Sequence, residues 1–228
     1  MIRLDEISTG LREVQDRITQ TKHQQSVTLV VVTKTFPVED IQTLYDLGVR
    51  DFGENRIEEL ELKAPVLPKD VRWHFLGQIQ GKKIRRICQY AHVIHSLDSL
   101  EHAQKFAHAL EDLKRDLTFF LQVNLEKERD DRGGVGVNEI PDFLQNSPVE
   151  ISGLMVVLPM NIQPSEGFKQ VANAERNLQE NGFPGVHFLS MGMSNDFESA
   201  IAEGATHIRV GSSILGSRPP LEIGRAHV

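Results

Sequence analysis

A single lysine, Lys34, follows the most apolar short run near the start of the chain. Residues 29–32 are LVVV, which predicts a strand buried on both faces, and Pro37 opens a helical pattern soon after the lysine. Chemistry in α/β proteins gathers at the carboxyl ends of strands, where a partly desolvated lysine amine is a nucleophile toward aldehydes. Lys34 is therefore a candidate Schiff-base residue, although a solvated or paired lysine would give the same local pattern.

Two late segments rich in glycine and serine could bind an anion. LSMGMSND and RVGSSILG each include the end of a predicted strand and the loop after it. Loops after the last two strands of a barrel commonly bind phosphate through backbone N–H groups and hydroxyls. The glycines that permit close approach of the backbone are Gly192, Gly211 and Gly216, and the serines that offer hydroxyls are Ser190, Ser194, Ser212 and Ser213. An ordinary helix cap at Ser194 and an ordinary turn at Gly211 are the alternatives.

Arg209 lies between two apolar residues in the last predicted strand, so its side chain is expected to point into the barrel. A buried guanidinium needs an acceptor, for which a ligand nitrogen or carboxylate and the side chain of Glu54 are alternatives. An amine on the first strand and a phosphate cradle on the last two favour pyridoxal 5′-phosphate, whose aldehyde and phosphate lie on opposite sides of one ring. Asn55, near the end of the second predicted strand, could also face this ligand or could cap the next helix.

These residues must be positioned by repeated strand and helix pairs. Strands are predicted around residues 29–32, 49–55, 71–77, 92–97, 117–125, 150–157, 186–194 and 206–213, and a helix follows each except the last. An amphipathic helix over residues 2–18 precedes them. The pattern predicts an α/β fold, a single (β/α)8 TIM barrel over residues 1–220, with residues 221–228 as a frayed tail or a remnant of cloning. A doubly wound open sheet is the alternative, but no G-x-G-x-x-G follows the first strand.

The composition argues against nucleic-acid, membrane and metal-binding functions. The chain has 228 residues and a net charge of −7 with scattered basic residues, so neither a nucleic-acid nor an anionic-membrane surface is indicated. The lone Cys88 fits a reducing compartment, and the cytoplasm is expected. No histidine has metal-ligand spacing, so His92 and His95 are interpreted as strand-edge residues and no metal site is expected. His74 and Asn124, near strand ends, could face a ligand or cap the next helix.

The order of short motifs along the chain resembles that of the pyridoxal phosphate homeostasis proteins, the YggS/PROSC family. The motifs are VVTKT, FGEN, WHFLGQIQGKK, IHSLDS, LQVN, GLM, LSMGMSND and AIAEGATHIRVGSSILGSR. The resemblance implies a barrel similar to the N-terminal domain of bacterial alanine racemase, with pyridoxal 5′-phosphate in Schiff-base linkage to Lys34. It also implies a phosphate site at Ser194, Gly211 and Ser212, and a place for Arg209 near the pyridine nitrogen.

Four positions depart from the commonest pattern of that family. They are Arg56, Gln78, Arg132 in the charged loop over residues 126–136, and Ser212 in place of threonine. None of them removes the lysine, the arginine or the hydroxyl at the phosphate. The departures therefore concern access to the site and the choice of partner.

The resemblance also implies a carrier or regulator of the cofactor, with apo-enzymes that need pyridoxal 5′-phosphate as partners. A permanently protonated arginine disfavours the pyridinium form and weakens the cofactor as an electron sink. The chain stops soon after its eighth predicted strand, and its only tyrosines, Tyr45 and Tyr90, fall in predicted helices or at their edges. No catalytic residue is therefore expected, and a monomer is favoured. The alternatives are a low-efficiency amino-acid racemase and a cofactor-free phosphate-binding barrel with Lys34 as an aldolase-like amine.

Overall fold

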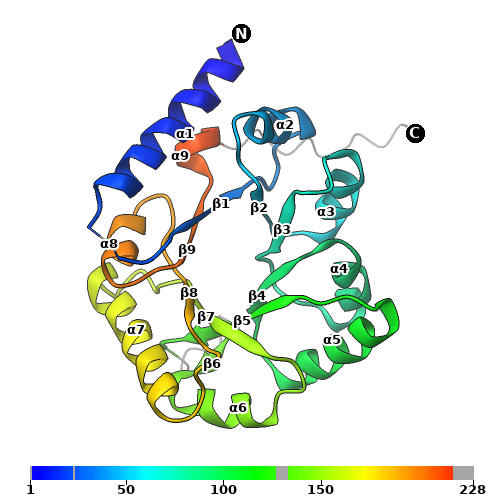
Figure 1. Ribbon diagram of the computed structural model, residues 1–228, viewed down its shortest axis with the longest axis vertical. Helices are drawn as coiled ribbons and strands as arrows, with labels where there is room; N and C mark the ends of the chain where they lie inside the picture. The colour runs from blue at the N-terminus through cyan, green and yellow to red at the C-terminus, as the bar shows by residue number, and fades with distance from the viewer. Residues whose placement is uncertain (1, 23, 127–132, 218–228) are drawn as a thin grey trace.

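The computed structural model describes residues 2–22, 24–126 and 133–217. Eight parallel strands form a closed ring in the order β1-β2-β3-β4-β5-β7-β8-β9, and β1 pairs with β9 to complete it (Figure 1). Their bounds are Thr28–Val32 (β1), Asp51–Glu54 (β2), Arg72–Phe75 (β3), Val93–Leu97 (β4), Thr118–Asn124 (β5), Ile151–Val156 (β7), Phe188–Ser190 (β8) and His207–Val210 (β9). The predicted (β/α)8 barrel is confirmed. A further short strand, β6 (Val135–Gly136), pairs with β5.

The helices surround the barrel, and an additional helix precedes the first strand. Their bounds are Ile2–Gln20 (α1), Val38–Asp46 (α2), Ile57–Lys63 (α3), Ile84–Tyr90 (α4), Leu100–Leu113 (α5), Ile140–Asn146 (α6), Pro164–Glu180 (α7), Phe197–Ala202 (α8) and Ser212–Leu215 (α9). Three short 3-10 turns cover Ala64–Val66, Gly81–Lys83 and Val137–Glu139. The prediction that no helix follows the last strand is wrong. Because α9 has four residues and follows Gly211 with two serines, its start has the composition of a turn and it has too few residues to show a helical period.

Side chains alternate between the inside of the barrel and the layer beneath the helices. Val93, Phe120 and Met155 form a small apolar cluster of their own, apart from the large cluster that includes Phe52, Phe119 and Leu154. The two clusters contain adjacent residues of the same strands, as the period of two in a strand requires. The smaller cluster therefore fills part of the barrel interior. Other interior positions hold the buried polar side chains of His74, His95, Ser190 and Arg209.

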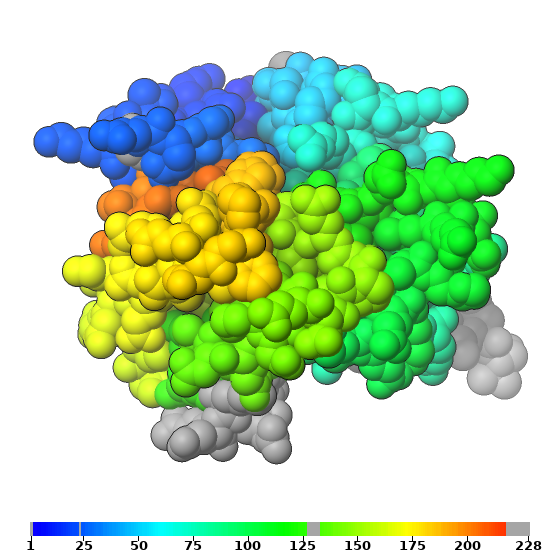
Figure 2. Space-filling view, turned by 60° about the horizontal axis from the view of Figure 1, so that its bottom comes forward, coloured from blue at the N-terminus to red at the C-terminus, as the bar shows by residue number. Residues whose placement is uncertain are grey.

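Helix α1 covers the segment that follows the last strand, and Figures 1 and 2 show the blue helix against the orange and red end of the chain. Its buried face is formed by Ile7, Leu11 and Val14. At Gly10 the approach is close enough that a Cβ would lie 2.9 Å from the carbonyl oxygen of Ser213. The first turn of α1 is also fixed to α2 and α9.

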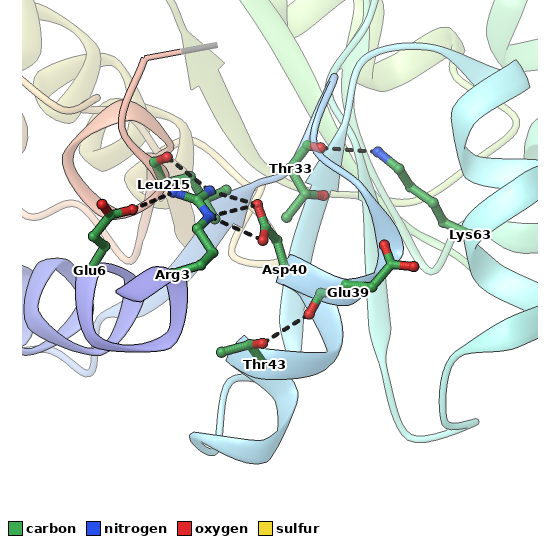
Figure 3. Close-up of polar contacts among 8 residues, drawn as sticks. All are labelled: Arg3, Glu6, Thr33, Glu39, Asp40, Thr43, Lys63 and Leu215. Carbon is green, nitrogen blue, oxygen red and sulfur yellow. Dashed lines mark hydrogen bonds and ion pairs between the residues drawn. The ribbon is translucent and has the colours of Figure 1, made fainter. Parts of the chain in front are cut away.

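Arg3 joins α1, α2 and α9 (Figure 3). Its Nη2 donates to Asp40 Oδ2 at 2.6 Å and to the carbonyl oxygen of Leu215 at 3.1 Å. The cation thus lies at the carboxyl end of α9, where the charge of Arg3 and the helix dipole attract each other. The additional N-terminal helix therefore holds α9, and with it Ser212, in place. The predicted tail over residues 221–228 lies outside the described residues.

Among the described residues, no helix is long and apolar enough to cross a membrane.

Candidate functional site

A cavity of about 490 Å³ opens where the strands end, and it is lined by all six residues that the sequence indicated as cofactor contacts. These are Lys34, Asn55, Ser194, Arg209, Gly211 and Ser212. The volume lies within the range of roughly 300–1,000 Å³ that small-molecule and cofactor sites have. Apolar residues that sequence reasoning did not single out complete the wall, namely Val32, Phe36, Leu76, Met155, Val157 and Met193.

Lys34 lies directly after β1 in a loop that is held on both sides. The backbone N–H of Thr33 donates to the carbonyl oxygen of Gly53 at 2.9 Å, which continues the pairing of β1 with β2. On the other side, the N–H of Thr35 donates to Glu59 Oε2 at 2.7 Å, and Thr35 has a φ of +70°, which is uncommon for a residue with a side chain. These contacts fix the backbone from which the Lys34 side chain reaches the cavity.

A buried ion cluster reinforces this loop from the α3 side, and Figure 3 shows one of its contacts, from Lys63 to Thr33. Lys63 Nζ donates to the carbonyl oxygen of Thr33 at 3.0 Å, to Glu54 Oε1 at 2.7 Å and to Glu59 Oε2 at 2.9 Å. The hydroxyl of Thr33 donates to the same Glu54 oxygen at 2.6 Å. Burial raises the pKa of the Glu54 carboxyl, while Lys63 and Thr33 act in the opposite direction. An amphipathic pattern places a lysine on the helix surface, so sequence reasoning did not find Lys63.

The alternative that pairs Glu54 with Arg209 is wrong. Glu54 points away from the barrel axis toward α3, where Lys63 and Thr33 are its partners. Arg209 instead points into the barrel, as expected, and is 6% exposed. Its Nη1 donates to Ser190 Oγ and its Nη2 to the carbonyl oxygen of Val156, each at 2.7 Å.

The charge on Arg209 faces the cavity. Burial lowers the pKa of its guanidinium to about 10, an effect that Asp196 opposes, so the group is a cation at neutral pH. Within the described residues, the hydrogen bonds of Arg209 engage Nη1 and Nη2, and none is formed by Nε. These two bonds use two of the five N–H groups of the guanidinium, so the Nε–H is among the donors available to a ligand.

The two glycine-serine loops meet at Ser194. Its Oγ accepts a hydrogen bond from the backbone N–H of Gly211 at 3.4 Å and lies 3.2 Å from Ser212 Oγ. A Cβ at Gly211 would come within 3.1 Å of the carbonyl oxygen of Val32, so a larger residue would crowd the end of β1. Gly192 has a φ of +91°, a conformation that glycine adopts at little cost. Hydroxyl and backbone donors from two loops thus converge on one place, as an anion site requires.

Asn55 supplies an independent indication that the cavity takes a polar ligand. Its Oδ1 is one of the few buried side-chain nitrogen or oxygen atoms in the described ranges without a hydrogen-bond partner. A buried amide oxygen without a partner is costly, and a ligand donor would remove that cost. The residue therefore fits the role of a ligand contact.

The histidines of β3 and β4 do not have the positions that the sequence suggested. His95 is not at a strand edge, because its ring is fully buried inside the barrel and stacks on Phe120 with ring centroids 4.6 Å apart. His74 is fully buried as well and contacts His95, so it neither caps a helix nor faces the cavity. Because β4 is buried on both faces, its sequence shows no alternation that would distinguish an inward histidine.

The other two polar candidates stay outside the cavity. His92 Nδ1 accepts a hydrogen bond from the backbone N–H of Trp73 at 3.0 Å. Asn124, the last residue of β5, accepts one at Oδ1 from the N–H of Glu126 at 2.9 Å and so supports the turn after the strand. Across the part of the chain that the structure describes, no group of three or more His, Cys, Asp or Glu side chains could hold a metal ion.

Comparison with known proteins shows the family of the chain. Residues 2–219 match the family described as alanine racemase, N-terminal domain. A pyridoxal phosphate homeostasis protein of Synechocystis is 35% identical over 85% of this chain and 92% of its own length, and that of Schizosaccharomyces pombe is 34% identical over 97% of both. The chain belongs to the pyridoxal phosphate homeostasis protein family.

Solved structures place this family member among similar barrels. PipY of Synechococcus elongatus, determined with PLP bound, is 35% identical, covers 92% of this chain and 100% of its own, and has a TM-score of 0.79. A protein of unknown function from Bifidobacterium adolescentis is 28% identical over 93% of this chain and 96% of its own, with a TM-score of 0.84. A lysine/ornithine decarboxylase of Vibrio vulnificus, 17% identical with a TM-score of 0.70 over 92% of this chain and 62% of its own, shares the fold.

Proposed function

We propose that this family member binds pyridoxal 5′-phosphate and serves the homeostasis or carriage of that cofactor. Lys34 holds the aldehyde as a Schiff base, Ser194, Gly211 and Ser212 hold the phosphate, and Arg209 faces the ring nitrogen. Asn55 is the remaining polar contact. The relatives named for pyridoxal phosphate homeostasis and the PLP-bound structure of PipY support this proposal.

The observation that carries the proposal is the meeting of three unlike groups in one cavity. A lysine on the first strand, a guanidinium on the last and a pair of hydroxyls on the last two loops all line it. An aldehyde, a ring nitrogen and a phosphate are the chemical complements of these three groups. Pyridoxal 5′-phosphate carries all three on one small ring.

A carrier or regulatory role is favoured over catalysis by the residues around that ring. Bound pyridoxal 5′-phosphate supplies an electron sink for carbanions when its ring nitrogen is protonated. Arg209 offers the nitrogen an N–H donor and no proton, so this chain's own residue opposes that state. The ionisable side chains that line the described cavity are Lys34, Asp196 and Arg209. Tyr45 and Tyr90 lie in α2 and α4 and do not line it.

The proposed compartment is the cytoplasm and the proposed oligomeric state is a monomer. A cytoplasmic monomer that passes the cofactor to apo-enzymes fits the single buried cysteine and the net charge of −7, which oppose disulfide, nucleic-acid and membrane roles. Burial raises the pKa of the Cys88 thiol to about 11, so this cysteine is a packed residue and not a nucleophile.

Ligand titration tests the phosphate part of the assignment. Pyridoxal 5′-phosphate is expected to bind with a visible Schiff-base band, and pyridoxal, which lacks the phosphate, about tenfold or more weakly. Ser194→Ala is expected to weaken binding of the phosphorylated ligand about tenfold and that of pyridoxal little. Ser165→Ala, an exposed serine on α7, is the matched control. Equal affinity for the two ligands would show that the loops do not hold the phosphate.

A low-efficiency amino-acid racemase is the second candidate, favoured by the match to the alanine racemase N-terminal domain. Incubation of the loaded protein with single enantiomers in deuterated water measures exchange of the α-proton. We expect exchange no faster than with free pyridoxal 5′-phosphate, because Arg209 opposes the protonated ring and no tyrosine lines the described cavity. Exchange well above the free cofactor would establish the racemase instead.

A further inference from the structure

A continuous line of hydrogen bonds crosses the interior of the barrel below the cavity. It starts at Asp51, at the beginning of β2, whose Oδ1 lies 2.9 Å from His74 Nε2. His74 Nδ1 lies 2.8 Å from His95 Nε2, and His95 Nδ1 lies 2.7 Å from Ser190 Oγ. Ser190 Oγ then accepts from Arg209 Nη1 at 2.7 Å. The line thus joins a carboxylate at the opposite end of the barrel to the cation that faces the cavity.

The groups at the two ends determine the direction of every bond between them. A guanidinium only donates, so Ser190 Oγ accepts from Arg209, and its single O–H is free to donate to His95 Nδ1. His95 then carries its proton on Nε2 and donates to His74 Nδ1. His74 carries its proton on Nε2 as well and donates to the carboxylate of Asp51. Each donor faces an acceptor, and both imidazoles are neutral.

The opposite direction is costly. If His95 donated from Nδ1 to Ser190, the buried hydroxyl would lose its acceptor among the described residues. His74 would then have to donate to both His95 and Asp51, which requires an imidazolium in the barrel interior. Burial lowers the pKa of His74, and that of His95 well below its ordinary value, although Asp51 acts in the opposite direction on His74. The geometry and the burial therefore favour the neutral arrangement.

We propose that Asp51, His74, His95 and Ser190 are positioning residues for Arg209, joined in a one-way hydrogen-bond relay with both histidines in the Nε2–H form. The relay orients the guanidinium that faces the cavity through its bond to Ser190 Oγ, and it ends on the carboxylate of Asp51, which also lies 3.8 Å from Arg72 Nε. Its effect on a bound cofactor rests on the proposed function. Its existence and direction do not, because they concern this chain alone.

Nitrogen-15 NMR of histidine-labelled protein without added cofactor tests the direction of the relay. The two neutral tautomers and the imidazolium give different nitrogen shifts and different couplings to the ring protons. His74 and His95, assigned with His74→Gln and His95→Gln, are expected to show the Nε2–H form at neutral pH. An Nδ1–H form of His95, or an imidazolium at His74, would overturn the proposal.

Variants at the two ends test whether the relay acts on the cavity. Asp51→Asn keeps an acceptor for His74 but removes the charge, and Ser190→Ala removes the partner of both His95 and Arg209. We expect each variant to raise the dissociation constant of pyridoxal 5′-phosphate about threefold to thirtyfold, the effect of about 0.5–2 kcal/mol of coupling. Asp70→Asn is the control, because this exposed carboxylate pairs with Arg50 outside the relay.

A spectroscopic readout separates positioning from a loss of stability. Asp51→Asn removes the negative charge at the end of the relay and leaves Arg209 positive, so the cavity becomes more positive. The pKa of the cofactor Schiff base is therefore expected to fall, and the absorption band of the Schiff base measures that pKa. An unchanged band titration and affinity in both Asp51→Asn and Ser190→Ala would refute the coupling. If the wild-type protein binds no pyridoxal 5′-phosphate, the proposed function fails, while the tautomers measured by NMR still decide the relay.

Discussion

Lys34→Ala is expected to abolish the visible absorption band of bound pyridoxal 5′-phosphate and to weaken its binding by about 100-fold or more, which corresponds to about 2.7 kcal/mol. The amine at this position is the proposed covalent attachment point, so the variant keeps the phosphate loops and Arg209 but loses the Schiff base. The cavity itself is expected to persist, because the backbone contacts of Thr33 and Thr35 do not involve the Lys34 side chain. Absorption spectra and equilibrium dialysis measure the two effects.

Lys63, a buried lysine near this loop, is a poor alternative for the attachment. Its Nζ donates to the carbonyl oxygen of Thr33 and to one oxygen each of Glu54 and Glu59, which engages all three of its N–H groups. A nitrogen that donates three hydrogen bonds has no electron pair free for an aldehyde. Borohydride reduction followed by peptide mapping is therefore expected to label Lys34 and not Lys63.

Two controls make the Lys34 result interpretable. Lys34→Arg keeps a positive charge without a nucleophilic amine and is expected to lose the band as fully as Lys34→Ala. Lys169→Ala removes an exposed lysine from α7 and is expected to keep both band and affinity. A band that survives in Lys34→Ala would place the attachment at another residue.

The barrel could be predicted because its signals are local and repeat along the chain. The apolar runs that became β1, β5 and β7 are separated by amphipathic segments with recognisable ends, such as Ser99, whose Oγ accepts a hydrogen bond from the N–H of His102 at the start of α5. The closed ring then follows from eight such units. The cavity residues could be predicted for the same reason, since parallel strands bring their carboxyl ends to one face of the barrel.

The parts that could not be predicted depend on contacts between distant segments. The pairing of Glu54 with Lys63 depends on the rotation of α3 about its axis, which an amphipathic pattern specifies only roughly. The relay from Asp51 to Ser190 joins residues on four strands whose relative registers are known only once the barrel is built. The period of two does place His95 on the same side of β4 as Val93, so a strand register would have been sufficient to find it.

Acidification below about pH 6.5 is expected to destabilise the protein steeply. Burial lowers the pKa of His74 and His95, and it lowers that of His207 to about 3. These side chains are neutral in the folded chain and become protonated in the unfolded chain as the pH falls through about 6.5. Their contribution to stability is therefore complete above that pH and is lost as the pH falls toward the folded-state values.

The size of the expected pH dependence of the unfolding free energy follows from the number of protons that the chain takes up on unfolding. Each such histidine contributes a slope of up to about 1.4 kcal/mol per pH unit, so three contribute up to about 4 kcal/mol per pH unit near pH 5. Glu54 and Glu175 act in the opposite direction, because burial raises their pKa and the folded chain then binds protons first. Urea unfolding at pH 7, 6 and 5 measures the net slope.

His207→Gln separates the histidines from the carboxyl groups. The ring of His207 packs on Phe120 with centroids 5.0 Å apart and is outside the relay. Glutamine at this position therefore removes one titrating group and leaves the line from Asp51 to Arg209 intact. The slope between pH 6 and 5 is expected to fall by about 1.4 kcal/mol per pH unit, whatever the stability of the variant at pH 7. An unchanged slope would mean that His207 is already protonated in the folded chain. The same experiment on His74→Gln and His95→Gln would then bear on the relay, whose direction requires that both imidazoles stay neutral.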